Sequence, residues 1–196
     1  MGLAYIDTGA MYRGITLLGM RSGISPEDDE EKLIELVRNA ELKFEPGQER
    51  FRVYLNGEDV TRAIRQPAVS RQVSYYARVP SVRQLLALLQ RELAAAGGVV
   101  MEGRDIGTVV LPDADKKFFV TASPLERARR RQRELAQQGY RVKLEDLVRE
   151  IEERDRLDSS RSVAPLRIAP GAIVIDTSDL TVDEVVARIV AEVGEI

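Results

Sequence analysis

The stretch AYIDTGAMYR, residues 4–13, decides the fold class of this chain. Residues 4–6 are typical of a buried strand, residues 7–9 predict a polar turn with a glycine, and a helix that carries Arg13 follows. A strand that runs through such a turn into a helix is how α/β folds build phosphate sites. The stretch therefore predicts an α/β protein with an anion-binding turn close to its N-terminal end.

The rest of the chain alternates between helical and strand-like periods, which is typical of an α/β domain. Short apolar runs, typical of central parallel strands, lie at 97–105, 116–123 and 172–178. Helices are predicted at 10–22, 25–39, 67–96 with a break at Pro80, 124–138, 144–161 and 181–193. The second of these helices is expected to start at Ser25-Pro26-Glu27, where a capping residue precedes a proline.

Residues 41–64 have a different character from their surroundings. They predict short antiparallel strands, with a hairpin turn at Asn56-Gly57. We expect a small β lobe that is inserted into one domain spanning residues 1–196.

The composition excludes several kinds of site. The 196 residues include no histidine and no cysteine, which removes Ser/His/Asp and Cys/His catalysis and zinc held by imidazole or thiolate. We predict no metal-ligating residues. No apolar run is long enough to cross a membrane and no secretory signal is present, so a cytoplasmic protein is expected. The net charge of −3 disfavours binding to nucleic acid, whereas clustered arginines suit a small phosphorylated ligand.

The helix predicted at 144–161 carries the sharpest signal of a binding site. Its apolar stripe consists of Leu144, Leu147, Val148 and Ile151. Helical periodicity places Arg154, Asp158 and Arg161 close to the continuation of that stripe. Surface ion pairs at the end of a helix are the plainer interpretation. Three charged residues at this spacing favour a convergent site, in which two guanidiniums held by a carboxylate bind phosphate.

Two further segments carry candidate residues. Arg104 and Asp105 follow the apolar run at 97–105, where ligands bind in doubly wound sheets. The arginine could bind phosphate and the carboxylate could accept a hydrogen bond from an exocyclic amine, although an ordinary polar turn also fits. The segment 126–141 is dense in arginine, and a solvated helix is the plainer interpretation for most of it. The functional interpretation is a mobile lid, in which Arg127 and Arg131 neutralise a transferring phosphate.

Four long motifs make the whole chain resemble the bacterial cytidylate kinases, which phosphorylate CMP and dCMP with ATP. The motifs are LAYIDTGAMYRG, VYLNGEDVTRAIRQPAVS, VVMEGRDIGTVVLPDADKKFFVTASPLERARRR and ERDRLDSSRSVAPL. The resemblance implies a parallel-sheet, P-loop kinase-like α/β core flanked by helices. It also implies that the β insert belongs to an enlarged nucleotide-binding lobe and that residues of about 124–161 form a lid.

The resemblance also implies roles for single residues. Thr8 and Arg13 are expected to meet CMP, with Arg13 on its phosphate. Ser74 and Asp105 are expected to read the cytosine, with Arg83 and Arg104 on base or phosphate nearby, although Ser74 and Arg83 by themselves fit ordinary helix positions. Asp158 is expected to hold a ribose hydroxyl and Arg161 to support it. Arg154, with the lid residues Arg127 and Arg131, is expected to face the transferring phosphate.

One element of the family pattern is not in the sequence. The family has a strand, a G-x-x-x-x-G-K-[ST] loop and a helix ahead of the segment that matches residues 3–13, and here no glycine is followed by lysine. ATP and Mg²⁺ are expected for the family, but the loop that holds them is absent, so impaired ATP binding is expected. A start site assigned too far downstream, or a truncation, is the expected cause. A missing central strand would expose strand edges and favour association, whereas the complete protein is expected to be a monomer.

Two other functions remain open. A non-catalytic CMP-binding module, or pseudokinase, fits the missing loop. An RNA-binding protein that uses the arginines at 127–133 is the third interpretation, and it predicts an affinity that falls steeply with salt.

Overall fold

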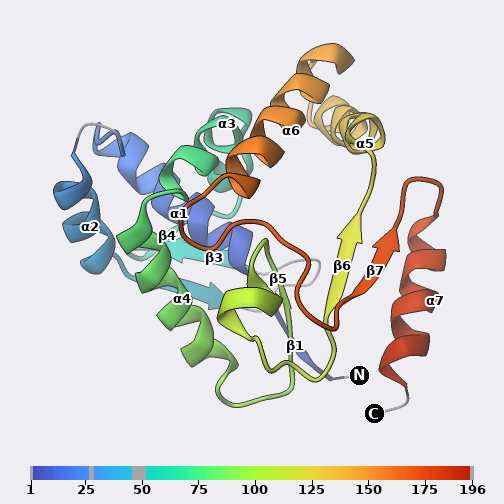
Figure 1. Ribbon diagram of the computed structural model, residues 1–196. Coiled ribbons are helices and arrows are strands. Elements are labelled where there is room, and N and C mark those ends of the chain that lie inside the picture. The colour runs from blue at the N-terminus through green and yellow to red at the C-terminus, as the bar shows by residue number, and fades with distance from the viewer. Residues whose placement is uncertain (1, 27–28, 46–51, 195–196) are drawn as a thin grey trace. The chain divides into compact units, whose positions relative to one another are not determined.

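The computed structural model describes residues 2–26, 29–45 and 52–194 of the chain (Figure 1). Contacts divide it into two compact units, Gly2–Gly103 and Arg104–Ile196, which are described separately. Helices, parallel strand pairs and a small antiparallel sheet confirm the predicted α/β class. The single domain over 1–196 and the lid at 124–161 stay predictions.

The opening stretch of the chain contains the predicted strand and helix, but the prediction of a turn at residues 7–9 is wrong, because the helix begins at Thr8. Strand β1, Ala4–Asp7, leads directly into helix α1, Thr8–Arg21. The Asp7 carboxylate caps this helix by accepting the backbone N–H of Ala10 at 2.9 Å. β1 pairs in parallel with β5, Val99–Glu102, so the two strands end side by side at Asp7 and Glu102.

The prediction of a buried strand at residues 4–6 is wrong. Tyr5 is 40% exposed, and its register partner Val100 is 49% exposed. Successive side chains of a strand point to opposite faces, and only the face of β5 with Val99 and Met101 is partly covered.

Three further helices complete the 2–103 unit: α2, Glu30–Arg38, α3, Pro67–Tyr76, and α4, Pro80–Ala94. A 3₁₀ turn η1, Ala63–Arg65, precedes α3. The predicted break at Pro80 is confirmed, since Val79 is extended ahead of the proline. The predicted helix start at Ser25-Pro26 is wrong. Asp29 caps α2 instead, because its carboxylate accepts the Lys32 N–H at 3.0 Å and acidic residues fill the first turn; residues 27–28 lie outside the described residues.

The predicted β insert is confirmed. Its antiparallel strands are β2, Leu42–Glu45, β3, Arg52–Leu55, and β4, Glu58–Asp59; residues 46–51 lie outside the described residues. Asn56 and Gly57 connect β3 to β4 with φ angles of 50° and 81°, which suit a tight hairpin turn.

Helix α1 forms the centre of the core in the 2–103 unit. One cluster packs α1 against the β insert and α3, and a second packs it against α2 and α4. The largest fully buried side chains of the two clusters include Met11, Ile15, Leu33, Ile64 and Leu86. Burial of α1 from two sides fixes the direction in which its polar residues project.

The described part of the second unit, residues 104–194, contains a parallel strand pair and three α-helices. Strands β6, Phe118–Thr121, and β7, Ile173–Asp176, run side by side, and a short π-helical turn η2, Ile106–Val110, precedes them. Helices α5, Pro124–Gln137, and α6, Leu144–Ser159, pack through a small apolar cluster, and α7, Val182–Val193, follows β7 (Figure 1).

The two strands of this pair are only partly covered. Val120 is 52% exposed and Val174 is 53% exposed, so each strand has an apolar side chain that the described residues leave largely uncovered. Among the described residues the parallel strands form two separate two-stranded ladders, one in each unit. None of the helices within the described ranges is long and apolar enough to cross a membrane.

Candidate functional site

A buried carboxylate organises the charged residues of the 104–194 unit. The Asp158 side chain is 1% exposed and lies next to three guanidiniums. Arg104 Nε donates to its Oδ2 at 3.2 Å, Arg154 Nε lies 3.8 Å from the same oxygen, and Arg161 donates to Oδ1. The prediction that Arg154, Asp158 and Arg161 converge is therefore confirmed.

The predicted helix boundary at residue 161 is wrong, since α6 ends at Ser159. The chain then folds back, and the Leu166 N–H donates to the backbone carbonyl of Asp158 at 2.8 Å. Arg161 thus reaches Asp158 from outside the helix, with a side chain that is 5% exposed.

The cluster has an excess of positive charge, because three guanidiniums surround one carboxylate. The Arg104 side chain is 44% exposed and that of Arg154 is 32% exposed, so both keep surface that an anion can reach. Arg161 is buried and supports the carboxylate. Such an arrangement can bind phosphate through charge-assisted hydrogen bonds. Asp105, next to Arg104, is only 6% exposed, and its backbone carbonyl accepts the N–H of Val109 at 2.8 Å in η2.

The predicted lid arginines differ in their surroundings. Arg127 donates through Nε to the Ala122 carbonyl at 3.0 Å and through both terminal nitrogens to Asp155 of α6. Arg131 donates to Glu134, one turn along the same helix, at 2.6 Å. Sequence reasoning missed Asp155, although helical periodicity places this residue on the continuation of the apolar stripe, four residues after Ile151.

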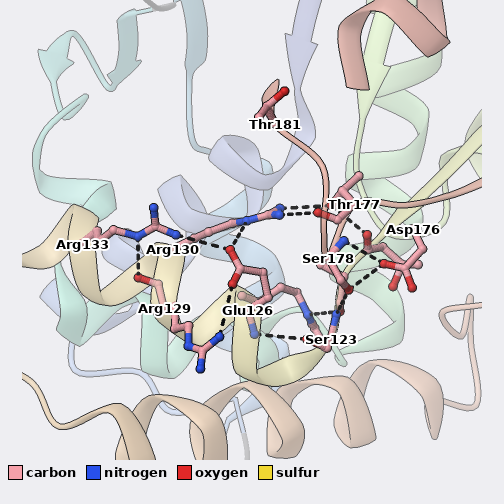
Figure 2. A network of polar contacts seen from close by, with 12 residues as sticks. Ser123, Glu126, Arg129, Arg130, Arg133, Asp176, Thr177, Ser178 and Thr181 are labelled. Carbon is pink, nitrogen blue, oxygen red and sulfur yellow. Dashed lines mark hydrogen bonds and ion pairs between the residues drawn. The ribbon is translucent and has the colours of Figure 1, made fainter. Parts of the chain in front are cut away.

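A second polar network joins the first half of α5 to the end of β7 (Figure 2). Arg130 donates to the hydroxyl of Thr177 at 3.0 Å and to its carbonyl at 2.5 Å, and the Thr177 hydroxyl donates to the Thr121 carbonyl at 2.9 Å. The Ser123 N–H donates to the Ser178 hydroxyl at 2.9 Å. Arg130 also contacts Glu126 at 3.1 Å, and Glu126 lies within ion-pair distance of two more arginines, Arg129 and Arg133. The base of α5 is thus held to the carboxyl ends of both strands.

In the 2–103 unit, Thr8 and Arg13 lie on α1, the first at its start and the second more than one turn further on. Thr8 is buried, and its hydroxyl donates to the Glu102 carbonyl at 2.7 Å, which ties the ends of β1 and β5 together. Arg13 Nη1 donates to the Ser70 hydroxyl of α3 at 2.7 Å and to the Ile64 carbonyl of η1 at 3.4 Å.

Ser74 and Arg83 are both buried, at 5% and 3% exposed. Ser74 lies one turn beyond Ser70 on α3, so it is on the helix face that Arg13 contacts. The Arg83 guanidinium lies 5.4 Å from the centre of the Tyr12 ring and donates to the Ala77 carbonyl at 2.9 Å. Their predicted contacts with a ligand stay predictions.

The carboxyl end of β5 is also a charged position. Burial and a hydrogen bond to the Glu102 carboxylate raise the pKa of Tyr5 well above its ordinary value. Within the described ranges, no group of three or more acidic side chains is placed to hold a metal ion.

These features define a class: an α/β protein with arginine clusters, one of which lies at the ends of parallel strands. A family model described as cytidylate kinase matches residues 1–195. The cytidylate kinase of Caldanaerobacter subterraneus subsp. tengcongensis is 53% identical over 189 residues, which cover 96% of this chain and 82% of that protein. The cytidylate kinase of Pelotomaculum thermopropionicum is 53% identical over 195 residues, or 99% of this chain and 86% of that protein.

A longer protein of Synechococcus sp. (strain JA-2-3B'a(2-13)), a bifunctional pantoate ligase/cytidylate kinase, is 52% identical over 96% of this chain and 35% of its own length. The chain therefore belongs to the cytidylate kinase family and is a kinase. The resemblance in the sequence motifs is confirmed.

Proposed function

We propose that this chain binds CMP or dCMP and takes part in phosphoryl transfer from ATP to that nucleotide, which gives CDP or dCDP. Family membership supports the reaction. The observation that carries the proposal is the buried Asp158 with its three arginines, because a preorganised carboxylate and guanidiniums are what a nucleotide's ribose and phosphate require.

The roles in the 104–194 unit follow from exposure and charge. Asp158 would accept a hydrogen bond from a ribose hydroxyl, while Arg161 holds its other oxygen. Arg104 and Arg154, which keep exposed surface, would bind phosphate. Asp105 would accept from the amino group of cytosine.

In the 2–103 unit, Arg13 would bind the acceptor phosphate from α1, with Thr8 at the start of the same helix. Ser74 would read the cytosine, and Arg83 would contact base or phosphate nearby. The supporting contact is that of Arg13 with α3, the helix on which Ser74 lies.

Phosphoryl transfer by this family needs positioning and charge neutralisation rather than a covalent nucleophile. A chain without histidine or cysteine is compatible with that chemistry. Arg127 and Arg131 on α5, together with Arg154 on α6, would neutralise charge on the transferring group. Mg²⁺ would bind together with ATP and neutralise part of the negative charge on its phosphates.

We also propose that the 196-residue chain binds CMP but is impaired in binding ATP, and that its phosphoryl transfer is slow for that reason. The supporting observation is that its sequence contains no G-x-x-x-x-G-K-[ST] motif, the loop that cradles ATP phosphates in such kinases. A non-catalytic CMP-binding module is the second candidate function, and the same observation favours it. A cytoplasmic location, and a monomeric state or association through strand edges, stay predictions.

Calorimetric titration of the full chain with CMP and with ATP, beside a coupled kinase assay, tests these proposals. We expect CMP to bind, and Asp158→Asn to weaken CMP binding by about tenfold or more, as expected for loss of a charged hydrogen-bond acceptor. Asp146→Asn, which changes an exposed ion pair on the same helix, is the matched control and should leave CMP affinity unchanged. Absence of CMP binding would overturn the proposed function, and normal turnover would overturn the proposed impairment with ATP.

A further inference from the structure

We infer that Ser70 is a positioning residue for Arg13, and that through this arginine it sets the affinity of the chain for the phosphate of its acceptor nucleotide. The inference rests on the proposed function, because it needs Arg13 to bind that phosphate. It gives a role to Ser70 of α3, the last residue of the motif VYLNGEDVTRAIRQPAVS, for which the resemblance implied none.

The contact joins two helices that are far apart in the chain. Arg13 projects from α1, and its Nη1 donates to the Ser70 hydroxyl oxygen at 2.7 Å across 57 residues of sequence. The same nitrogen lies 3.4 Å from the Ile64 carbonyl, which is long for a hydrogen bond. Ser70 is therefore the stronger of these two partners.

A hydrogen bond at one nitrogen orients the whole guanidinium, because the group is planar and its donors form a rigid fork. Arginine side chains otherwise lose considerable rotamer entropy when they bind a ligand. A guanidinium that Ser70 already orients has lost part of that freedom before the ligand arrives. The hydroxyl thus favours phosphate binding without touching the phosphate.

The segment 64–70, which carries Ser70, is itself held in place by packing and hydrogen bonds. Ile64 and Val69, which flank this corner of the unit, are 0% and 1% exposed. The Ser70 N–H donates to the Gln66 carbonyl at 3.1 Å in the first turn of α3. Arg65 in η1 donates to the Asp7 carboxylate at 3.0 Å, and Asp7 caps α1. The segment 64–70 therefore holds α1 both at its N-terminal cap and at Arg13.

A serine suits this position for a chemical reason. Its oxygen accepts from the cationic guanidinium, and its short side chain keeps the acceptor close to the α3 backbone. Alanine would remove the acceptor that Arg13 Nη1 meets at 2.7 Å, so that this nitrogen keeps its longer contact with the Ile64 carbonyl. Threonine keeps the hydroxyl, and cysteine keeps the shape but accepts hydrogen bonds weakly.

The test is calorimetric titration of the full chain with CMP and with cytidine, which lacks the phosphate. We expect Ser70→Ala to weaken CMP binding roughly three- to tenfold, which corresponds to the net contribution of an ordinary intramolecular hydrogen bond. Cytidine affinity should not change, and Ser70→Thr should restore most of the CMP affinity. In an Arg13→Ala background, Ser70→Ala should have no further effect on CMP binding.

Ser81→Ala is the matched control. Like Ser70, Ser81 hydrogen-bonds a charged side chain through its hydroxyl, but it donates, to Glu30 at 2.7 Å, and it lies on the first turn of α4. This variant should leave the affinities for CMP and cytidine unchanged. If Ser70→Ala does not fold in a thermal melt, Ser70→Cys replaces it in the same comparison.

The outcomes separate this inference from the proposed function. If Arg13→Ala leaves CMP affinity unchanged, both the proposed phosphate role of Arg13 and the inference about Ser70 are wrong. If Arg13→Ala weakens CMP binding but Ser70→Ala does not, the inference alone is wrong. Equal losses for CMP and cytidine in Ser70→Ala would show a general structural role and would also overturn it.

Discussion

The Arg127 guanidinium meets the Asp155 carboxylate through both terminal nitrogens, at 2.9 Å for Nη1–Oδ1 and 2.5 Å for Nη2–Oδ2. The two side chains are 30% and 32% exposed and join α5 to α6. A two-pronged pair of this kind is stronger and better oriented than a single surface ion pair. It supplements the small apolar cluster around Ala128 and Leu147 that packs the two helices together.

We therefore predict that Asp155→Asn lowers the free energy of unfolding by about 1 kcal/mol, because it removes one charge from a partly buried pair. Urea unfolding followed by circular dichroism measures this change. Glu153→Gln, on the same helix, removes the charge from an exposed pair with Arg156 and should change stability much less. Equal effects of the two substitutions would contradict the prediction.

Asp158→Asn should be far more damaging than Asp155→Asn. It leaves the guanidiniums around a fully buried position without their counter-charge, and breaking a buried ion pair typically costs about 3–5 kcal/mol. Urea unfolding again provides the measurement. Asp146→Asn, at an exposed pair with Arg149, should stay within about 0.5 kcal/mol of the wild type. If Asp158→Asn leaves the free energy of unfolding unchanged, the buried cluster does not depend on its carboxylate.

Gly19→Ala should destabilise the 2–103 unit. A Cβ at Gly19 would lie 2.3 Å from Cε1 of Tyr76, a buried ring that is held in place by its hydroxyl bond to the Ile24 carbonyl. Overpacking of this kind typically costs about 1–3 kcal/mol. Thermal melting should show the loss, and the cost should shrink in a Tyr76→Ala background.

Gly14→Ala is the control for that substitution, since it lies on the same helix. Its Cβ would meet the flexible end of Leu42 at 3.3 Å, and alanine favours a helix more than glycine does. We expect a clearly smaller loss, or a gain. A larger loss for Gly14→Ala than for Gly19→Ala would contradict the steric explanation.

The ion pair between Arg21 and Glu58 should make stability depend on pH in the acid range. The hydrogen bond from Arg21 holds the pKa of Glu58 below its ordinary value of 4.5. Because the folded pKa is the lower one, the pair contributes stability above the ordinary value and loses it as the pH falls through the folded pKa.

Melting temperatures of the wild type and of Glu58→Gln should therefore differ at neutral pH and converge in acid. The difference is expected to be small, since the pair is exposed. Thermal melts of both proteins at a series of pH values provide the measurement. A difference that is the same at neutral and acid pH would show that the Glu58 charge is not responsible.

Much of the local structure could be predicted from the sequence, because short-range chemistry determines it. The hairpin at Asn56-Gly57 and the helix break before Pro80 each depend on the conformational preferences of a few neighbouring residues. The convergence of Arg154 on Asp158 follows from helical periodicity alone.

The errors arose where two local signals competed or where burial mattered. Ser25 and Asp29 both resemble helix caps, and the acidic first turn after Asp29 decided between them. Tyr5 and Val120 lie in apolar runs typical of buried strands, yet each is largely exposed. Exposure depends on which elements cover each face of a strand. The residues of the strand itself do not indicate which elements those are.

The sequence by itself determined the α/β class, the order of helices and strands, and the family, through motifs whose residues are neighbours in the chain. Only the tertiary structure decided which side chains meet over long separations. Arg104 reaches Asp158 across 54 residues, Arg13 reaches Ser70 across 57, and Arg127 reaches Asp155 across 28. The physical reason is that periodicity reports which face of one element is buried, whereas the partner across that face is selected by the packing of separate elements.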